Sequence, residues 1–368
     1  MKKVLFISNI PAPYRIDFFN ALGQVCELTV VFEAKRAAGV RFNWNEDQVK
    51  HFRSVFLSEG DIQETHINRR VFRYIKRGAY DHIVATSYGY YTETAALIKM
   101  RLLNIPYDIE IDGGVVRSNE NLLKRLVKRL IIRGATRLFS SGAAADEVFL
   151  HYGASSSRLV RYPFTSLHTC DLLTDVPSFA QKQSMKKMLG IPYHAVVLSI
   201  GQFIHRKGYD VLLPICGQLA RETGVYIIGG LPTQEYQRII NDYELSNVHF
   251  LSFMNKTELS HWLFAADVFV LPTREDMWGL VINEAMANAL PVITTDHCNA
   301  GLELVKNGKN GYLVPIENGM MLLARIKEVL ASDSLRTQFS TKSLEMIAKY
   351  TIEQMVQVHQ EAFDAERT

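Results

Sequence analysis

Short apolar runs alternate with helix-like segments along the whole chain. The run at 3–8 (KVLFIS) is bounded by Asn9 and two prolines, and an apolar-periodic segment follows at 16–22. A strand, a turn and a helix in this order begin an α/β unit. Further strands are predicted at 27–32, 81–87, 107–112, 137–141 and 158–163, with helices at about 68–78, 93–103, 119–133 and 143–152. The alternation predicts a parallel sheet with helices on both faces.

The alternation breaks after residue 165 and restarts near residue 193. Six further strands are predicted at 195–201, 225–230, 247–253, 267–272, 291–296 and 311–315. We therefore predict a first domain at 1–165, a linker at 166–192, a second domain at 193–350 and a polar helix at 351–368 that crosses back to the first domain. The fold class is α/β, with two similar domains in tandem.

Composition fits this division and narrows the class of protein. A chain of 368 residues with 48% hydrophobic and 21% charged residues is long enough for two domains of roughly 150 residues each. Its four cysteines form no CxxC pair, which excludes a disulfide framework and a zinc cluster and fits a reducing compartment. The apolar run at the N-terminus is too short for a secretory leader, and no stretch approaches the ~20 apolar residues of a membrane span. We expect a cytoplasmic protein.

Positive charge is concentrated in the first half of the chain. Residues 1–180 hold 24 Lys/Arg against 18 Asp/Glu, whereas residues 181–368 hold 17 against 20. The excess lies in two clusters, Arg69, Arg70, Arg73, Lys76 and Arg77, then Lys124, Arg125, Lys128, Arg129, Arg133 and Arg137. This asymmetry predicts an anionic partner for the first domain. The helix over 121–137 either packs its leucines into the core, with a solvated basic side, or holds the domain against the anionic inner face of a membrane.

The segment 271–296 (LPTREDMWGLVINEAMANALPVITTD) is the most informative for chemistry. It predicts a strand, a loop and a helix that starts near Gly279. In an open parallel sheet the helix amides at this position point into the ligand-binding crevice, so a phosphate would sit at Gly279, Leu280 and Val281. Glu284 lies one turn deeper on the same stripe, where a carboxylate can accept both hydroxyls of a ribose. Asp276 precedes the helix and can reach sugar hydroxyls. The alternative is that both acids cap and solvate a surface helix.

These motifs resemble retaining glycosyltransferases of family 4, also described as glycosyl transferases group 1, which have the GT-B fold. The resemblance rests on an acid, one further residue, an aromatic residue and Gly-Leu-Val, followed by Glu-Ala-Met-Ala and Pro-Val-Ile. It extends to 200–213 (IGQFIHRKGYDVLL), 227–230, 266–272 and 303–314, and so spans most of the second domain. It implies two Rossmann-like domains facing each other across a cleft. Where the family usually has Glu, seven residues and Glu, this chain has Asp276, seven residues and Glu284.

The resemblance implies a role for each matching residue. The second acid holds the donor ribose, the first contacts the transferred sugar, and an Arg and a Lys neutralise the diphosphate. Lys207 falls on the family's Lys, but Gln202 replaces the Arg after Gly201, so Arg206 is the expected substitute. Asp112 occupies the position of a His near the reacting carbon, or else caps a strand. The predicted site comprises the catalytic residues Asp112, Asp276, Arg206 and Lys207 and the donor-binding residues Glu284, Gly279, Leu280, Val281 and Gly201, with no metal and no cofactor.

The first strand-to-helix turn departs from the family. It reads NIPAPYR at 9–15, where the family often has a Gly-rich loop. Tyr14 and Arg15 either face the cleft or belong to a rigid turn with an ordinary surface arginine.

We therefore expect a hexosyltransferase. It would use a nucleotide diphosphate sugar, which the resemblance implies is UDP-linked, and a saccharide or lipid-linked saccharide acceptor in cell-surface polysaccharide synthesis. Nucleic acid is not an expected partner. Two other classes stay open. One is a weakly catalytic or non-catalytic GT-B scaffold that binds a nucleotide sugar, suggested by Gln202, Asp112 and Asp276. The other is a nicotinamide-dependent oxidoreductase, which a GxGxxG after the first strand would support, but none is present.

Overall fold

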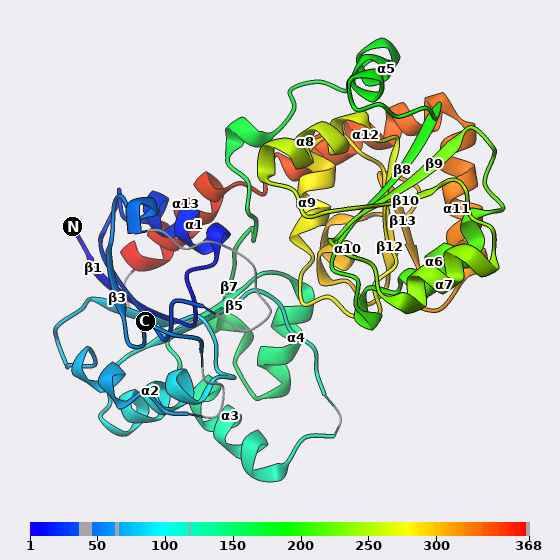
Figure 1. The fold of residues 1–368 in the computed structure, drawn as a ribbon. Coiled ribbons are helices and arrows are strands. Elements are labelled where there is room, and N and C mark those ends of the chain that lie inside the picture. Colours follow the sequence, from blue (N-terminus) through cyan, green and yellow to red (C-terminus); the bar gives the residue numbers. More distant parts are fainter. Residues whose placement is uncertain (37–45, 63–65, 118, 366–368) are drawn as a thin grey trace. The chain divides into compact units, whose positions relative to one another are not determined.

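A computed structural model describes residues 1–36, 46–62, 66–117 and 119–365 of the chain (Figure 1). The chain forms two compact units. The first contains Met1–Ser166 and Thr351–Thr368, and the second contains Leu167–Tyr350. Residues 366–368 of the predicted last helix lie outside the described residues.

The first unit is built on a seven-stranded parallel sheet of order β3-β2-β1-β4-β5-β6-β7. Its strands are β1 (Lys3–Ser8), β2 (Glu27–Phe32), β3 (Arg53–Phe56), β4 (His82–Ala85), β5 (Asp108–Ile111), β6 (Leu138–Ser140) and β7 (Leu159–Arg161). Its helices are α1 (Pro13–Leu22), α2 (Tyr91–Leu102), α3 (Leu122–Gly134), α4 (Ala143–His151) and α13 (Ile352–Asp364). The strand β3 was not predicted, and the helix expected at 68–78 is a 3-10 turn at Arg69–Arg73.

Alternate side chains of the central strands face opposite layers of this unit. Leu5 and Ile7 pack with buried residues of α2, α3 and α4, whereas Phe6 meets Phe18 and Phe19 of α1. The helix α13 packs beside α1 (Figure 1), where the ring of His359 contacts the ring of Phe18 at 4.9 Å. The last helix of the chain is therefore part of the first unit.

The second unit has a six-stranded parallel sheet of order β10-β9-β8-β11-β12-β13. Its strands are β8 (Ala195–Ile200), β9 (Thr223–Ile228), β10 (Val248–Leu251), β11 (Val268–Leu271), β12 (Val292–Thr295) and β13 (Gly311–Val314). Its helices are α5 (Phe179–Met188), α6 (Tyr209–Cys216), α7 (Gln234–Asp242), α8 (Lys256–Ala265), α9 (Leu280–Ala287), α10 (Asn299–Leu304), α11 (Gly319–Ala331) and α12 (Asp333–Ile347). Two Rossmann-like domains with the last helix in the first of them confirm the predicted fold class.

The segment predicted as a linker, 166–192, is packed on the second unit. Its helix α5 is anchored by buried lysines. Lys186 pairs with Asp267 at 2.7 Å, and Lys182 donates to the carbonyl of Ala266 at 2.5 Å. Burial lowers the pKa of Lys182 to about 8. The low apolar content that suggested a linker reflects a helix held by buried polar groups rather than by an apolar face.

Candidate functional site

The start of α9 depends on a glycine. Gly279 has φ of +101°, and a Cβ there would lie 2.9 Å from the sulfur of Cys298. A side chain at this position would be strained by its backbone conformation and would collide with a buried thiol. The first amides of the helix, those of Leu280 and Val281, have no intrahelical partner and are available to an anion at this end.

The loop after β8 carries the two predicted cations and is fixed to the loop after β11. The carbonyl of Arg206 accepts from the amide of Arg274 at 2.8 Å and from the hydroxyl of Thr273 at 2.9 Å. Gly208 closes the loop with φ of +70°, and a Cβ there would lie 2.0 Å from the carbonyl oxygen of Pro272. The two loops therefore touch backbone to backbone at the carboxyl edge of the sheet.

Three predicted residues converge at this edge. The ammonium of Lys207 lies 2.5 Å from one carboxylate oxygen of Asp276, and the guanidinium of Arg206 lies 3.5 Å from the other. Arg206 also donates to the carbonyl of Glu275 at 2.7 Å. The side chains of Lys207 and Asp276 are 11% and 13% exposed, whereas that of Arg206 is 42% exposed. The arrangement holds two positive charges against one negative charge, and the surplus is positive.

The other predicted donor residues lie on the same elements. Gly201 directly follows β8 and accepts a hydrogen bond from the hydroxyl of Tyr209 at 3.2 Å. Its α-carbon stands close to Lys207, because an added Cβ would lie 3.3 Å from the lysine side chain. Glu284 is half-buried, one turn along α9 from Leu280.

Sequence reasoning gave no role to Arg274, although the structure makes it central to this edge. Its guanidinium donates to both carboxylate oxygens of Asp210, at 2.8 and 2.6 Å, and also pairs with Glu317. Burial alone would raise the pKa of Asp210, but the bonds from Arg274 lower it. Arg274 follows Thr273 and precedes two acids in the segment TRED, and a basic residue within an acidic loop was the available signal.

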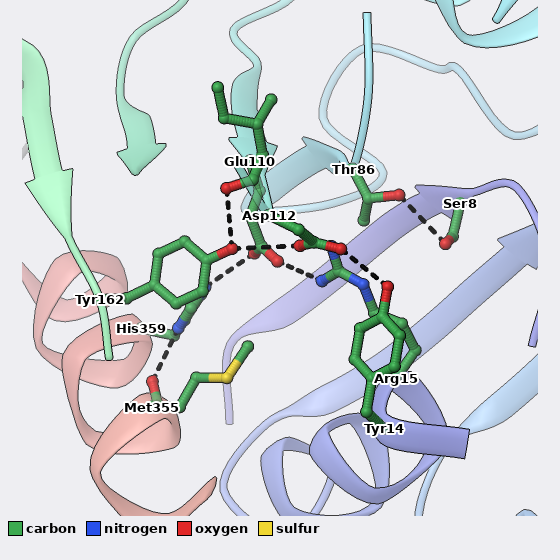
Figure 2. A network of polar contacts seen from close by, with 10 residues as sticks. Ser8, Tyr14, Arg15, Thr86, Glu110, Asp112, Tyr162, Met355 and His359 are labelled. Carbon is green, nitrogen blue, oxygen red and sulfur yellow. Dashed lines mark hydrogen bonds and ion pairs between the residues drawn. The ribbon is translucent and has the colours of Figure 1, made fainter. Parts of the chain in front are cut away.

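Asp112 lies in the first unit and belongs to a separate network (Figure 2). It directly follows β5 and pairs with the guanidinium of Arg15. Tyr14 donates to its carboxylate at 2.8 Å, and Tyr162 donates to it at 3.2 Å. Burial raises the pKa of Asp112 despite the charge of Arg15. A simple strand cap does not describe this residue, because three side chains converge on it, two from α1 and one from the residue directly after β7.

The same network ties the last helix of the chain to the sheet. Arg15 also pairs with the fully buried Glu110, and His359 of α13 lies 2.8 Å from the other carboxylate oxygen of Glu110 (Figure 2). Although burial would raise the pKa of Glu110, Arg15 and His359 lower it to about 2. Arg15 is 2% exposed, so its interpretation as an ordinary surface arginine is wrong.

Two features are absent from the described part of the chain. No group of three or more His, Cys, Asp and Glu side chains in it is placed to hold a metal ion. No helix in it is both long and apolar enough to cross a membrane.

Two Rossmann-like domains, each built on a parallel sheet, have the GT-B architecture. Residues 181–346, which make up most of the second unit and less than half of the chain, match the family model described as glycosyl transferases group 1.

Proteins of similar sequence and structure support this assignment. The chain is 30% identical over 156 residues to the lipopolysaccharide core biosynthesis glycosyltransferase LpsE of Rhizobium meliloti (strain 1021), covering 41% of this chain and 44% of LpsE. It is 34% identical over 153 residues to the putative colanic acid biosynthesis glycosyltransferase WcaL of Salmonella typhimurium (strain LT2), covering 39% of this chain and 37% of WcaL. These matches span less than half the length of either relative. The structure of Anabaena HepE in complex with UDP is similar over 98% of this chain and 99% of that one, with a TM-score of 0.79 and 16% identity.

Proposed function

We propose that the protein is a retaining glycosyltransferase. It moves a hexosyl unit from a UDP-linked sugar to a hydroxyl of a saccharide or lipid-linked saccharide acceptor in cell-surface polysaccharide synthesis. The observation that supports this most directly is the convergence of Lys207 and Arg206 on Asp276, beside the first turn of α9. Two cations and open helix amides at the carboxyl edge of a parallel sheet suit a diphosphate.

The contacts of Asp276 suggest how the donor enters. The carboxylate of Asp276 pairs with both Lys207 and Arg206. A diphosphate carries more negative charge than one carboxylate, so the diphosphate displaces Asp276 from these two cations. Asp276 is then available to accept hydroxyls of the transferred sugar, and Glu284 to accept those of the ribose. Asp112 is a further proposed acceptor of a sugar hydroxyl.

The proposed step needs no protein nucleophile. The acceptor hydroxyl attacks the anomeric carbon on the face that the diphosphate leaves, the bond to the phosphate oxygen breaks, and the proton passes to that oxygen. Lys207, Arg206 and the amides of Leu280 and Val281 stabilise the charge that develops on the leaving group. We propose that these groups suffice without a metal ion.

The names of similar proteins support the choice of donor and acceptor. LpsE and WcaL are named for lipopolysaccharide core and colanic acid biosynthesis, and HepE has been solved with UDP. The test is a panel of nucleotide sugars scored for release of nucleoside diphosphate, with and without saccharide acceptors and with excess chelator. We expect release with at least one UDP-sugar, undiminished by chelator. Binding of UDP-sugars without transfer or hydrolysis would instead indicate a non-catalytic scaffold.

We further propose that α3 holds the protein peripherally on an anionic membrane surface. The structure overturns the interpretation in which its leucines enter the core, because Leu122, Leu123, Leu126 and Leu130 are 75%, 70%, 62% and 47% exposed. Leu122, Leu126 and Leu130 lie at four-residue steps on one stripe, beside Arg125 and Arg129. An apolar stripe flanked by arginines suits the boundary between lipid headgroups and acyl chains.

Liposome flotation tests the membrane proposal. We expect binding to rise with anionic lipid and to fall with salt. The pair Arg125→Gln/Arg129→Gln removes ~2 kcal/mol of attraction, or roughly 30-fold in partitioning. Lys327→Gln/Lys349→Gln is the matched control, since both lysines are exposed and lie in the second unit. Equal flotation of the two double variants would leave α3 without a membrane role.

A further inference from the structure

The carboxyl edge of the first sheet buries more carboxyl groups than cations. Glu110 and Asp112 both pair with Arg15. Glu33 directly follows β2 and Glu93 lies in the first turn of α2, and within the described ranges neither has a cation within ion-pair distance. Buried polar groups are usually hydrogen-bonded, so these two carboxyls require an explanation.

Glu33 is held by one of its two oxygens. Its side chain is 5% exposed, and one carboxylate oxygen accepts from the hydroxyl of Thr92 at 2.6 Å. The other oxygen is buried and has no hydrogen-bond partner. Thr92 in turn accepts from the amide of Asn68 at 3.0 Å, which fixes the hydroxyl and so the orientation of the carboxylate.

Glu93 lies next to Thr92 in the chain and supports the same picture. It is fully buried, and neither of its carboxyl oxygens accepts a hydrogen bond of good geometry, although the side chains of Thr86 and Ser87 lie near enough to lower its pKa slightly. Burial, and then the charge of Glu33, raises the pKa of Glu93 to about 8. Glu93 is therefore mainly protonated at neutral pH. Burial also raises the pKa of Glu33, but the hydrogen bond from Thr92 and the charge of His66 oppose that rise, so the negative charge of the pair resides on Glu33.

A cavity of about 290 Å³ opens at Glu33. Its acidic lining residues other than Glu33 have partners of their own, since Glu59 pairs with Lys35 at 2.7 Å and Asp61 pairs with Arg36 at 3.4 Å. Glu33 is thus the lining acid with an oxygen that no described group satisfies. The cavity is near the lower end of the volumes that hold small ligands.

We propose that this cavity is an acceptor subsite in which an uncharged sugar ring donates a hydroxyl to the unpartnered oxygen of Glu33. The identification of the sugar as part of the acceptor rests on the proposed transferase function, whereas the binding itself does not. A carboxylate accepts sugar hydroxyls well and repels phosphate, so the subsite suits a neutral ring rather than a sugar phosphate. The cavity is lined by three acids, Glu33, Glu59 and Asp61. Arg70 and His66 also line it, so its acids outnumber its arginine, while Glu93 behind Glu33 is mainly neutral.

The test uses the full chain and simple sugars as probes. Saturation-transfer NMR is recorded with methyl α-glucoside, methyl α-mannoside and methyl α-galactoside, and with glucose 6-phosphate. We expect at least one methyl hexoside to bind and glucose 6-phosphate not to bind. Glu33→Gln should weaken that binding roughly ten- to a hundredfold, the range for a hydrogen bond to a charged group. Glu59→Gln is the matched control, because this acid lines the same cavity but is 80% exposed, and it should stay within about twofold of the unchanged protein.

Further measurements separate the subsite from folding and from the donor site. Thermal unfolding shows whether Glu33→Gln folds, and Thr92→Val, which removes the orienting hydroxyl at nearly constant volume, should also weaken methyl hexoside binding. UDP binding should be unchanged in both variants. The proposal is overturned if no methyl hexoside binds, if glucose 6-phosphate binds more tightly, or if Glu33→Gln and Glu59→Gln behave alike. Failure of the unchanged protein to bind UDP would contradict the transferase proposal and leave the sugar result standing.

Discussion

Replacing Lys207 with methionine tests the electrostatics of the proposed donor site. The substitution keeps most of the side-chain volume and removes the ammonium that lies 2.5 Å from Asp276. Both side chains are nearly nine-tenths buried, at 11% and 13% exposure, so solvent screens the pair only weakly. The variant therefore leaves a poorly hydrated carboxylate with Arg206 as its remaining cation.

The expected loss of stability follows from that remaining cation. Removing one partner of a buried ion pair costs ~3–5 kcal/mol when the other charge is left alone. Here Arg206 stays 3.5 Å from the same carboxylate and is 42% exposed, so we expect about 2 kcal/mol, below that range. Adding Asp276→Asn removes the uncompensated charge and should restore roughly half of the loss.

Ligand binding distinguishes a phosphate site from a merely structural ion pair. A bond between Lys207 and a phosphate is worth ~1.5–3 kcal/mol, but its formation breaks the pair with Asp276, so we expect about a tenfold loss of UDP affinity. Uridine affinity should be unchanged. Urea unfolding and calorimetric titration with both ligands measure the two effects. Equal losses for UDP and uridine, or unchanged UDP affinity, would refute the assignment of Lys207 to the diphosphate.

Four further predictions follow from named contacts. Glu284→Gln should raise the KM for the donor roughly tenfold or more and weaken uridine as well as UDP, because the ribose loses a charged acceptor; unchanged uridine affinity would contradict the ribose assignment. Asp276→Glu should retain transfer, whereas Asp276→Asn should lower kcat more than donor affinity. Steady-state kinetics measures both, and a larger loss of donor affinity than of kcat would contradict the prediction. Gly208→Ala should destabilise the second unit by ~2–4 kcal/mol, since a Cβ there meets a backbone carbonyl at 2.0 Å and φ is +70°. A midpoint of thermal unfolding within about 1 °C of that of the unchanged protein would show that the loop adapts. The pKa of Glu110 is lowered to about 2, so its contribution to stability is complete above its ordinary pKa and is lost as pH falls toward 2. Glu110→Gln should flatten this acid dependence in urea unfolding, and an unchanged profile would show that another group controls it.

The repeating elements were predictable from sequence because each buried strand is a short apolar run of its own. β1, β8 and β11 are examples in which the run and the strand nearly coincide. The strand β3 (RSVF) was missed because its four residues begin with an arginine and are all partly exposed or exposed, so no apolar run marks it. Pattern reasoning left open whether the leucines of α3 enter the core or face a membrane, since periodicity shows that a helix has an apolar face but not what that face contacts.

The second-domain site was largely predictable because its residues are close in sequence to glycines and strand ends. Arg206, Lys207 and Asp276 do converge, although Lys207 and Asp276 are 69 positions apart in the sequence, because β8 and β11 are neighbours in the sheet. The network around Asp112 was not predictable in the same way. It joins residues of α1, β5 and α13, and the pairing of Glu110 with His359 spans 249 positions of sequence. No local pattern marks a buried histidine as the partner of a strand carboxylate.

The carboxyl edges of the two sheets carry opposite charge. This changes the interpretation of the excess of Lys and Arg in the first half of the chain. The second unit, whose residues hold no excess of Lys and Arg, presents Lys207 and Arg206 at its carboxyl edge. The first unit, which holds the surplus, buries Glu33 and Glu93 and places the partly exposed Asp112 at the corresponding edge, and it displays many of its cations on α3 and near Arg69–Arg73 instead. Net charge therefore predicts what the outer surface of the first unit attracts, not what its sheet edge binds. An acceptor with a neutral sugar at one end and an anionic lipid linkage at the other would bind both the sheet edge and the basic outer surface of the first unit. A neutral acceptor without a lipid would bind the sheet edge alone. Comparing kcat/KM for these two acceptors in the Arg125→Gln/Arg129→Gln variant separates the contributions, because only the lipid-linked acceptor should lose efficiency.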